Sequence, residues 1–182
     1  AQKPKAVVDA ITHYYYNDNA NVHRGVHTLS QRATDAMEAV REQVREHIGA
    51  RESAEIIFTR GITDSINTVA FGMGALIKPH QNVVITALEH HSNIVPWQML
   101  CERTGATLRY IPINEKGELV LHSLEEIIDE HTVMVAFNHI SNSLGTINPV
   151  STILARAKAV GACTLVDGAQ SGPHAKVDVQ EW

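Results

Sequence analysis

The residues best suited to chemistry lie between Thr164 and Gln170. A short apolar run ends at the carboxylate of Asp167, and Gly168, Ala169 and the side-chain amide of Gln170 follow at once. In open α/β sheets, ligands bind beyond the carboxyl ends of the strands. We therefore expect Asp167 to face a ligand, although an Asp at a strand end could equally do no more than cap the next turn.

The same arrangement, an apolar run followed by polar groups, occurs three more times upstream. The runs 55–59, 82–86 and 132–137 lead into the polar segments 60–64, 89–93 and 138–142. Since the carboxyl ends of parallel strands meet at one edge of a sheet, we expect these groups to converge on a single site. A Gly turn with Thr63 at the start of a predicted helix is typical of a phosphate site, and capping of that helix by Thr63 is compatible with this role.

Hydrophobic periodicity predicts the elements that position these groups. Residues 4–17 and 28–48 are predicted to be helices, and from residue 55 strands and helices alternate. This alternation favours an α/β fold of three layers, with helices on both faces of a doubly wound, mostly parallel sheet. The predicted strands are 55–59, 82–86, 107–111, 132–138 and 162–167, and the helices between them are 63–74, 93–104, 123–130 and 149–160.

Composition narrows the class of protein. A chain of 182 residues that is 44% hydrophobic can bury a core of its own. Its net charge of −5 and the absence of a dense Lys/Arg run argue against nucleic-acid and anionic-membrane partners. No apolar stretch approaches the ~20 residues that span a bilayer. With two cysteines and no signal peptide, we expect a cytoplasmic protein in which Cys101 and Cys163 pack as small buried hydrophobes.

The 11 histidines raise the question of a metal site. The side chains of the adjacent His90 and His91 diverge, and no second group of ligands has suitable spacing. We therefore expect no bound metal, and we expect His91, His139 and His174 to be structural or surface residues.

The most specific evidence on function is a set of six sequence blocks. They are Gln2–Pro4, Val22–Ser30, Thr59–Asn67, Glu89–Gln98, Asn138–Thr146 and Val166–Gln170. Together they resemble the pyridoxal-phosphate (PLP) enzymes of fold type I in the class V aminotransferase group, and specifically the cysteine desulfurases and selenocysteine lyases. The resemblance spans nearly the whole chain, and the block Glu89–Gln98 is long enough to be highly specific.

The resemblance implies roles for five residues. Asp167 would face the pyridine nitrogen, where a carboxylate keeps the nitrogen protonated so that the ring accepts electrons. His90 would stack on the ring and relay protons as the catalytic residue. Gln170 and Asn142 would hydrogen-bond the region of the ring hydroxyl, and Thr63, with the backbone amides of its helix, would bind the phosphate.

The implied reaction removes sulfur from L-cysteine, or selenium from L-selenocysteine. Cysteine would give L-alanine and an enzyme persulfide, and the sulfur would pass to an acceptor protein for iron–sulfur cluster assembly. The resemblance also implies a homodimer, with His23 and Arg24 near the site across its interface. Another class V enzyme, an aminotransferase or an epimerase, would share Asp167 and Gln170, and a noncatalytic structural remnant of the fold is a further alternative.

Comparison with these families predicts that the chain is the central part of a longer enzyme. The chain begins at Ala1 without Met and ends at Trp182, and it contains neither the Ser-Gly-His-Lys block that supplies the cofactor lysine nor the loop cysteine that accepts sulfur. We expect residues 1–50 to form a helical segment and residues 51–182 to form part of the PLP-binding large domain. Alone, the chain is expected to be inactive and to bind PLP weakly. Ile62 stands where the families commonly have Thr, which weakens the expected phosphate contact.

Overall fold

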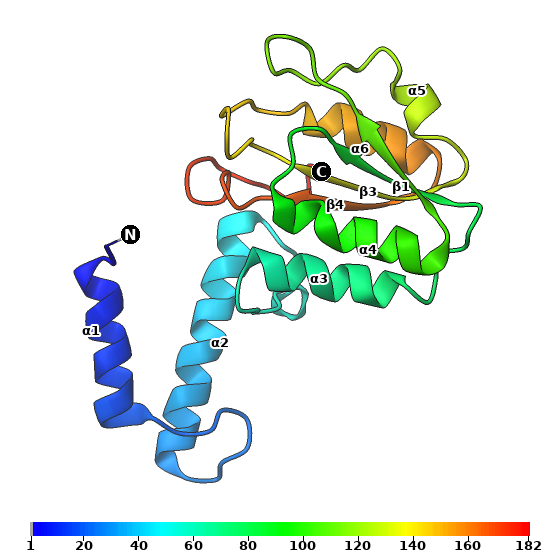
Figure 1. The fold of residues 1–182 in the computed structure, drawn as a ribbon. Coiled ribbons are helices and arrows are strands. Elements are labelled where there is room, and N and C mark those ends of the chain that lie inside the picture. The colour runs from blue at the N-terminus through cyan, green and yellow to red at the C-terminus, as the bar shows by residue number, and fades with distance from the viewer. Residues whose placement is uncertain (1) are drawn as a thin grey trace. The chain divides into compact units, whose positions relative to one another are not determined.

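The computed structural model describes residues 2–182, and Ala1, where the predicted helical segment begins, lies outside them. The chain divides into two compact units, one that ends at Ile56 and one that runs from Ile57 to Trp182. Figure 1 shows the helices and strands of each unit. None of the described helices is long and apolar enough to cross a membrane.

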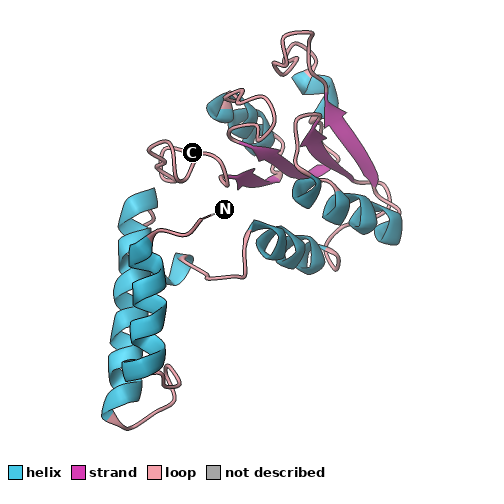
Figure 2. Ribbon diagram, turned by 60° about the vertical axis from the view of Figure 1, so that its left-hand side comes forward, coloured by secondary structure: helices cyan, strands magenta, loops and turns pink. Residues whose placement is uncertain are grey.

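The first unit is built on two helices that a loop connects (Figure 2). Helix α1 (Lys5–His13) continues into a π-helical turn over Tyr14–Asp18, and α2 (Thr28–Ile48) follows after a loop. Helix α2 begins where the Nδ1 atom of His27 accepts a hydrogen bond from the backbone N–H of Ser30, and it ends at Gly49, whose φ of 71° is left-handed. The predicted helix at 28–48 is confirmed.

The second unit contains a four-stranded parallel sheet with the order β2-β1-β3-β4. The strands are β1 (Asn82–Thr86), β2 (Thr107–Ile111), β3 (Thr132–Asn138) and β4 (Cys163–Asp167). From β1 the chain builds the sheet outward first to β2 and then, on the other side, to β3 and β4. Because the direction reverses between β1 and β3, a crevice is expected beyond the carboxyl ends of these two strands.

Helices cover both faces of the sheet (Figure 1). One face packs against α3 (Ile62–Met73) and α4 (Val95–Thr104), and the other packs against α5 (Leu124–Ile127) and α6 (Val150–Ala159). Alternate residues of β1 enter the two cores: Val83 and Ile85 join the cluster around Trp97, whereas Val84 joins the cluster around Ile153. The predicted three-layer α/β fold is confirmed.

The predicted strand at 55–59 is wrong. Ser53–Glu55 form one 3₁₀ turn, and the residues after it pair with no strand of the described sheet. The side chains of Ile57 and Phe58 remain 79% and 45% exposed. An apolar run becomes a strand only when it pairs with a neighbouring strand, and the run 55–59 is not one of the strands of the described sheet.

Three further expectations need smaller corrections. The predicted helix 4–17 is α-helical only as far as His13, and the predicted helix 123–130 shortens to α5. Cys101 is buried as expected, but Cys163 is exposed because it opens β4, which lies at an edge of the sheet.

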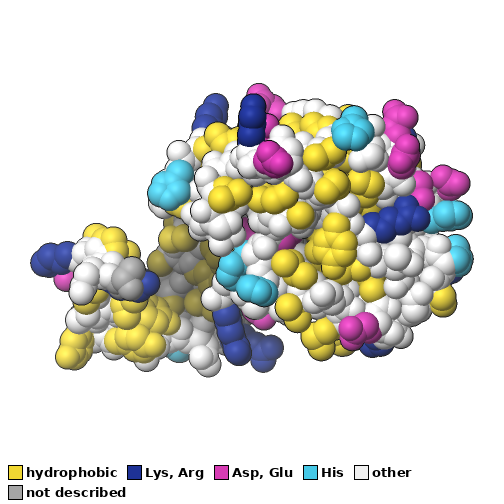
Figure 3. Space-filling model, turned by 45° about the horizontal axis from the view of Figure 1, so that its top comes forward, with side chains coloured by type: hydrophobic (Ala, Val, Ile, Leu, Met, Phe, Trp, Pro, Cys, Tyr) yellow, Lys and Arg dark blue, Asp and Glu magenta, His cyan; other side chains and the backbone are white. Residues whose placement is uncertain are grey.

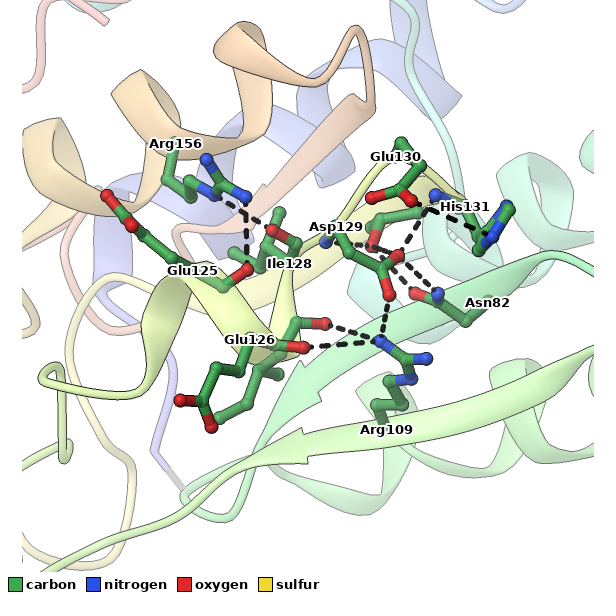
Figure 4. A network of polar contacts seen from close by, with 11 residues as sticks. Asn82, Arg109, Glu125, Glu126, Ile128, Asp129, Glu130, His131 and Arg156 are labelled. Carbon is green, nitrogen blue, oxygen red and sulfur yellow. Dashed lines mark hydrogen bonds and ion pairs between the residues drawn. The ribbon is translucent and has the colours of Figure 1, made fainter.

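A polar network fastens the amino ends of β1 and β3 (Figure 4). The Asp129 carboxylate accepts hydrogen bonds from Asn82 Nδ2 at 3.0 Å, from Arg109 Nη1 at 2.6 Å and from the backbone N–H of His131 at 2.9 Å. Thr132 Oγ1 donates to Asn82 Oδ1 at 2.8 Å. Burial opposes ionisation of Asp129, but these hydrogen bonds and the charge of Arg109 outweigh it and lower the pKa of the carboxyl to about 2. These hydrogen bonds therefore stabilise the sheet at this end.

Candidate functional site

A cavity of about 180 Å³, here called the central cavity, lies at the carboxyl end of the sheet. Four of the predicted site residues line it: His90 after β1, Asn142 after β3, Asp167 at the end of β4, and Gln170 three residues later. The remaining lining residues are Ile62, Ser92, Asn138, Ile140 and Ala169. The polar segments that follow three separate strands therefore meet at one place, at the point where the sheet reverses direction.

Asp167 is buried, whereas the other three residues are exposed. Asp167 is only 5% exposed, and its backbone carbonyl accepts a hydrogen bond from the N–H of His139 at 3.0 Å. Its side-chain Oδ1 accepts from the backbone N–H of Ala169 at 2.9 Å, so the carboxylate does cap the next turn. Within residues 2–182, the structure shows this one hydrogen bond for the Asp167 side chain. The second carboxylate oxygen can therefore accept a hydrogen bond from a molecule in the cavity.

His90 is oriented by its own turn. Its Nδ1 atom lies 2.8 Å from Ser92 Oγ and accepts a hydrogen bond from the backbone N–H of Ser92 at 3.2 Å. Because an N–H can only donate, Nδ1 acts as the acceptor and the neutral imidazole carries its proton on Nε2. The rings of His90 and His91 meet edge to face with their centroids 6.0 Å apart. In the part of the chain that the structure describes, no three His, Cys, Asp or Glu side chains gather as a metal ion would require.

Thr63 lies outside the central cavity, beside it. It is in the first turn of α3, which follows Gly61 with a left-handed φ of 150°. A second cavity of about 560 Å³ is lined here by Arg60, Gly61, Ile62, Thr63, Asp64 and Asn67. Ile62 lines both cavities, so the two adjoin. The first backbone N–H groups of α3 have no partner within the helix, which suits an anionic group placed at this end.

Glu89 belongs to the polar segment 89–93 that was expected at the site, but no role of its own was predicted for it; it is hydrogen-bonded to Asn138, which lines the central cavity. Glu89 Oε1 accepts hydrogen bonds from Thr86 Oγ1 at 2.5 Å and from the backbone N–H of Asn138 at 3.0 Å, and its Oε2 accepts from Asn93 Nδ2 at 2.7 Å. Burial raises the pKa of the Glu89 carboxyl to about 7, against the hydrogen bonds that lower it, and the negative charge of Asp167 adds to the rise. The available signal was an acidic residue directly before His90, after a strand whose five residues are all buried.

No individual role was predicted for Asn138 either, although it begins the polar segment 138–142, and it connects two of the segments that form the cavity. Its Nδ2 donates to the carbonyl of Leu88 at 2.7 Å, and its Oδ1 accepts from Asn148 Nδ2 at 2.6 Å. As the last residue of β3 it also pairs in register with Asp167 of β4. The predicted contacts of His23 and Arg24 across a dimer interface remain predictions; both residues belong to the first unit, where the backbone N–H of His23 donates to Thr34 Oγ1 at 3.0 Å.

Comparison with known proteins places the whole chain in one group. The family model for aminotransferase class-V matches residues 1–182. A cysteine desulfurase from Pectobacterium carotovorum subsp. carotovorum is 53% identical over 182 residues, and a probable cysteine desulfurase from Halalkalibacterium halodurans is 52% identical over the same length. The chain spans 45% of the length of each of these relatives.

Solved structures agree with the sequence comparison. The apo structure of a cysteine desulfurase from Thermococcus onnurineus NA1 superposes with a TM-score of 0.93 at 42% identity, over all of this chain and 45% of that one. A cysteine desulfurase from Escherichia coli gives a TM-score of 0.88 at 35% identity, over all of this chain and 46% of that one.

Proposed function

The chain belongs to the aminotransferase class-V family, and we propose that it forms part of a PLP-dependent cysteine desulfurase. The proposed enzyme removes sulfur from L-cysteine, giving L-alanine and an enzyme persulfide. The observation that carries the proposal is the convergence of His90, Asn142, Asp167 and Gln170 on one cavity, in a chain about half identical to cysteine desulfurases. Because the chain spans 45% of those relatives, the activity is proposed for the full-length protein, and the chain alone is expected to be inactive.

The size of the central cavity and the chemistry of the adjoining cavity fit PLP. An apolar cavity of about 150 Å³ holds a benzene ring, so the 180 Å³ of the central cavity suits one substituted six-membered ring. The second cavity, at the start of α3, suits the phosphate. When bound, PLP supplies an electron sink for the carbanion that forms at the substrate Cα.

Asp167 is proposed to hold the pyridine nitrogen of PLP in its protonated form. The hydrogen bond from Ala169 fixes one oxygen of the carboxylate, and the other is proposed to accept a bond from the ring N–H. Since Asp167 is buried, solvent screens this charge–charge interaction only weakly. Gln170 and Asn142 are proposed to hydrogen-bond the ring hydroxyl region from the same cavity.

His90 is proposed to stack on the ring and to move a proton through Nε2, because Nδ1 is occupied by Ser92. Thr63 is proposed to bind the phosphate together with the backbone N–H groups at the start of α3. Ile62 brings no hydroxyl to this cluster, but it keeps its backbone N–H. The phosphate contact is therefore proposed to depend mainly on the backbone and Thr63.

The proposal extends to the partners of the full-length protein. We propose that it acts on L-cysteine or L-selenocysteine, delivers sulfur to an acceptor protein for iron–sulfur cluster assembly, and functions as a homodimer. A cytoplasmic location is part of the proposal, since Cys101 and Cys163 are free thiols. Lys and Arg side chains are scattered over the face drawn in Figure 3. No nucleic-acid partner is proposed.

An assay of products tests the proposal against another class V activity. The full-length protein that contains this chain is incubated with L-cysteine, PLP and a reducing thiol, and alanine and sulfide are measured together. We expect the two products in equal amounts. Transfer of an amino group to a keto acid, without sulfide, would indicate an aminotransferase, and racemisation without either product would indicate an epimerase. Failure to bind PLP at all would favour the noncatalytic alternative.

A further inference from the structure

Three hydrogen-bond donors surround the carboxylate of Glu89. They are the hydroxyl of Thr86, the backbone N–H of Asn138 and the side-chain NH₂ of Asn93. A carboxylate is the only ionised side chain that accepts on both oxygens and donates on neither, so it matches this set of partners.

The orientation of the Asn93 amide is fixed from its far side. Trp97 Nε1, which can only donate, gives its proton to Asn93 Oδ1 at 2.9 Å, and both side chains are fully buried. The NH₂ group of Asn93 must therefore point toward Glu89. A glutamine at position 89 would present its own NH₂ to one of the three donors and leave two buried donors facing each other.

The contacts of Glu89 join two segments that line the central cavity: the segment after β1, which carries His90, and the end of β3. Glu89 precedes His90 directly, and it binds the backbone N–H of Asn138, whose side chain binds the carbonyl of Leu88 in return. Asn138 is the register partner of Asp167. The chain of contacts thus leads from the segment of His90, through the end of β3, to the carboxylate at the end of β4.

We propose that Glu89 is a positioning residue for this site: its carboxylate fastens the segment that carries His90 to the end of β3 and so sets where His90 stands relative to Asp167. The proposal rests on the proposed PLP site, because it concerns the width of the cavity into which the ring would fit. Burial raises the pKa of the Glu89 carboxyl to about 7, so the ionised form that matches the three donors is populated at neutral pH and dominates above it.

An exchange of donor and acceptor tests the geometry. In E89Q the side-chain amide faces the Asn93 amide, and in N93D two carboxylates face each other. In the double variant E89Q/N93D, the new carboxylate at position 93 accepts from both Trp97 and the new amide at position 89. The hydrogen bond between positions 89 and 93 is thereby restored with donor and acceptor exchanged, and the total charge is unchanged. The matched control is E102Q, since Glu102 is an exposed residue of α4.

Two quantities are measured on the full-length protein that contains this chain: the dissociation constant of PLP, by titration of the PLP-free protein, and the midpoint of thermal unfolding without PLP. We expect E89Q to weaken PLP binding on the order of tenfold, as loss of a group that orients the ligating side chains does at metal sites. We expect the double variant to recover most of this loss and E102Q to bind PLP like the wild type.

Each other outcome has a definite meaning. An E89Q protein whose unfolding midpoint falls while its PLP affinity stays within twofold of the wild type shows a structural role alone and overturns the inference. A weakened E89Q that the folded double variant does not rescue overturns it as well. If E89Q fails to fold, the double variant decides: wild-type affinity supports the inference, and lost affinity in a folded protein rejects it. Absence of PLP binding by the wild type would overturn the proposed function and the inference with it.

Discussion

Asn138 and Asp167 stand opposite each other as the last residues of β3 and β4, and both line the central cavity. Their pairing means that the sheet itself, and not a flexible loop, sets the distance between the amide and the carboxylate. The segment that follows β1 is bound to the end of β3 as well, because Glu89 accepts a hydrogen bond from the backbone N–H of Asn138. Perturbation of any of these residues is therefore expected to change the cavity.

Neutralising Asp167 is expected to weaken PLP binding about ten- to a hundredfold, since a hydrogen bond to a charged group contributes roughly 1.5–3 kcal/mol. The variant D167N keeps an oxygen that can accept from the N–H of Ala169, so the turn is retained while the charge is lost. PLP titration of the full-length protein checks this, with D35N on the exposed face of α2 as the control. Equal affinities for wild type and D167N would contradict the role given to this carboxylate.

Replacing His90 by Asn tests the roles of its two ring nitrogen atoms separately. In H90N the amide oxygen takes the place of Nδ1 and can accept from the backbone N–H of Ser92, but nothing replaces Nε2. We expect an unfolding midpoint close to that of the wild type and a rate of alanine formation that is roughly 10²–10⁴-fold lower. The neighbouring exposed residue provides the control, H91N, which should keep its rate. A fully active H90N would exclude proton transfer through Nε2.

A hydroxyl introduced at position 62 should strengthen the phosphate contact. The variant I62T adds one donor beside Thr63 in the second cavity, and a single added hydrogen bond corresponds to about three- to tenfold tighter binding of PLP. Pyridoxal, which lacks the phosphate, should bind to both proteins alike. A gain for pyridoxal equal to the gain for PLP would mean that position 62 acts on the ring instead.

The pH dependence of stability should reveal Asp129. Its pKa is lowered in the folded protein, so its stabilising effect is present above the unfolded pKa near 4 and is lost as the pH falls toward 2. D129N should reduce the free energy of unfolding by about 1–2 kcal/mol at pH 7, after allowance for partial solvent screening. Denaturant unfolding at pH 7 and pH 3 measures the difference, which should shrink at pH 3. E130Q, at the exposed neighbour, should show neither effect.

Glu89 should make the stability of the protein fall as the pH rises, which is opposite to the effect of Asp129. The Glu89 pKa of about 7 in the folded protein lies above the unfolded value, so folding is favoured by the protonated form and stability declines as the pH rises from about 4.5 through 7. The decline attributable to Glu89 is on the order of 3 kcal/mol, and Asp167 is the charged neighbour that contributes to it. E89Q cannot ionise at position 89, so it should not share this decline. The stability of E89Q relative to the wild type should therefore rise between pH 5 and pH 8. A difference that stays constant with pH would contradict the raised pKa.

Much of the fold follows from local pattern. The strands at 82–86, 107–111 and 132–138 have the predicted bounds: the first and third are short apolar runs, and 107–111 lies between Gly105 and Pro112. The helix at 28–48 likewise begins and ends at its predicted residues. The run at 55–59 has the same local pattern and forms no strand. Hydrogen bonds of a strand come from another part of the chain, and local pattern contains no information about whether such a partner is present.

The chemical groups that follow each strand can be read from the sequence alone: a carboxylate at Asp167, an imidazole at His90 and amides at Asn142 and Gln170. That information is local, since it depends on where an apolar run ends. Tertiary structure alone decided that these groups share one cavity with Ile62 while Thr63 lines the adjoining one, and that Glu89 is held under them by three donors. The physical reason is that strand order, burial and the orientation of the Asn93 amide arise from contacts between residues far apart in the chain, so no single segment specifies them.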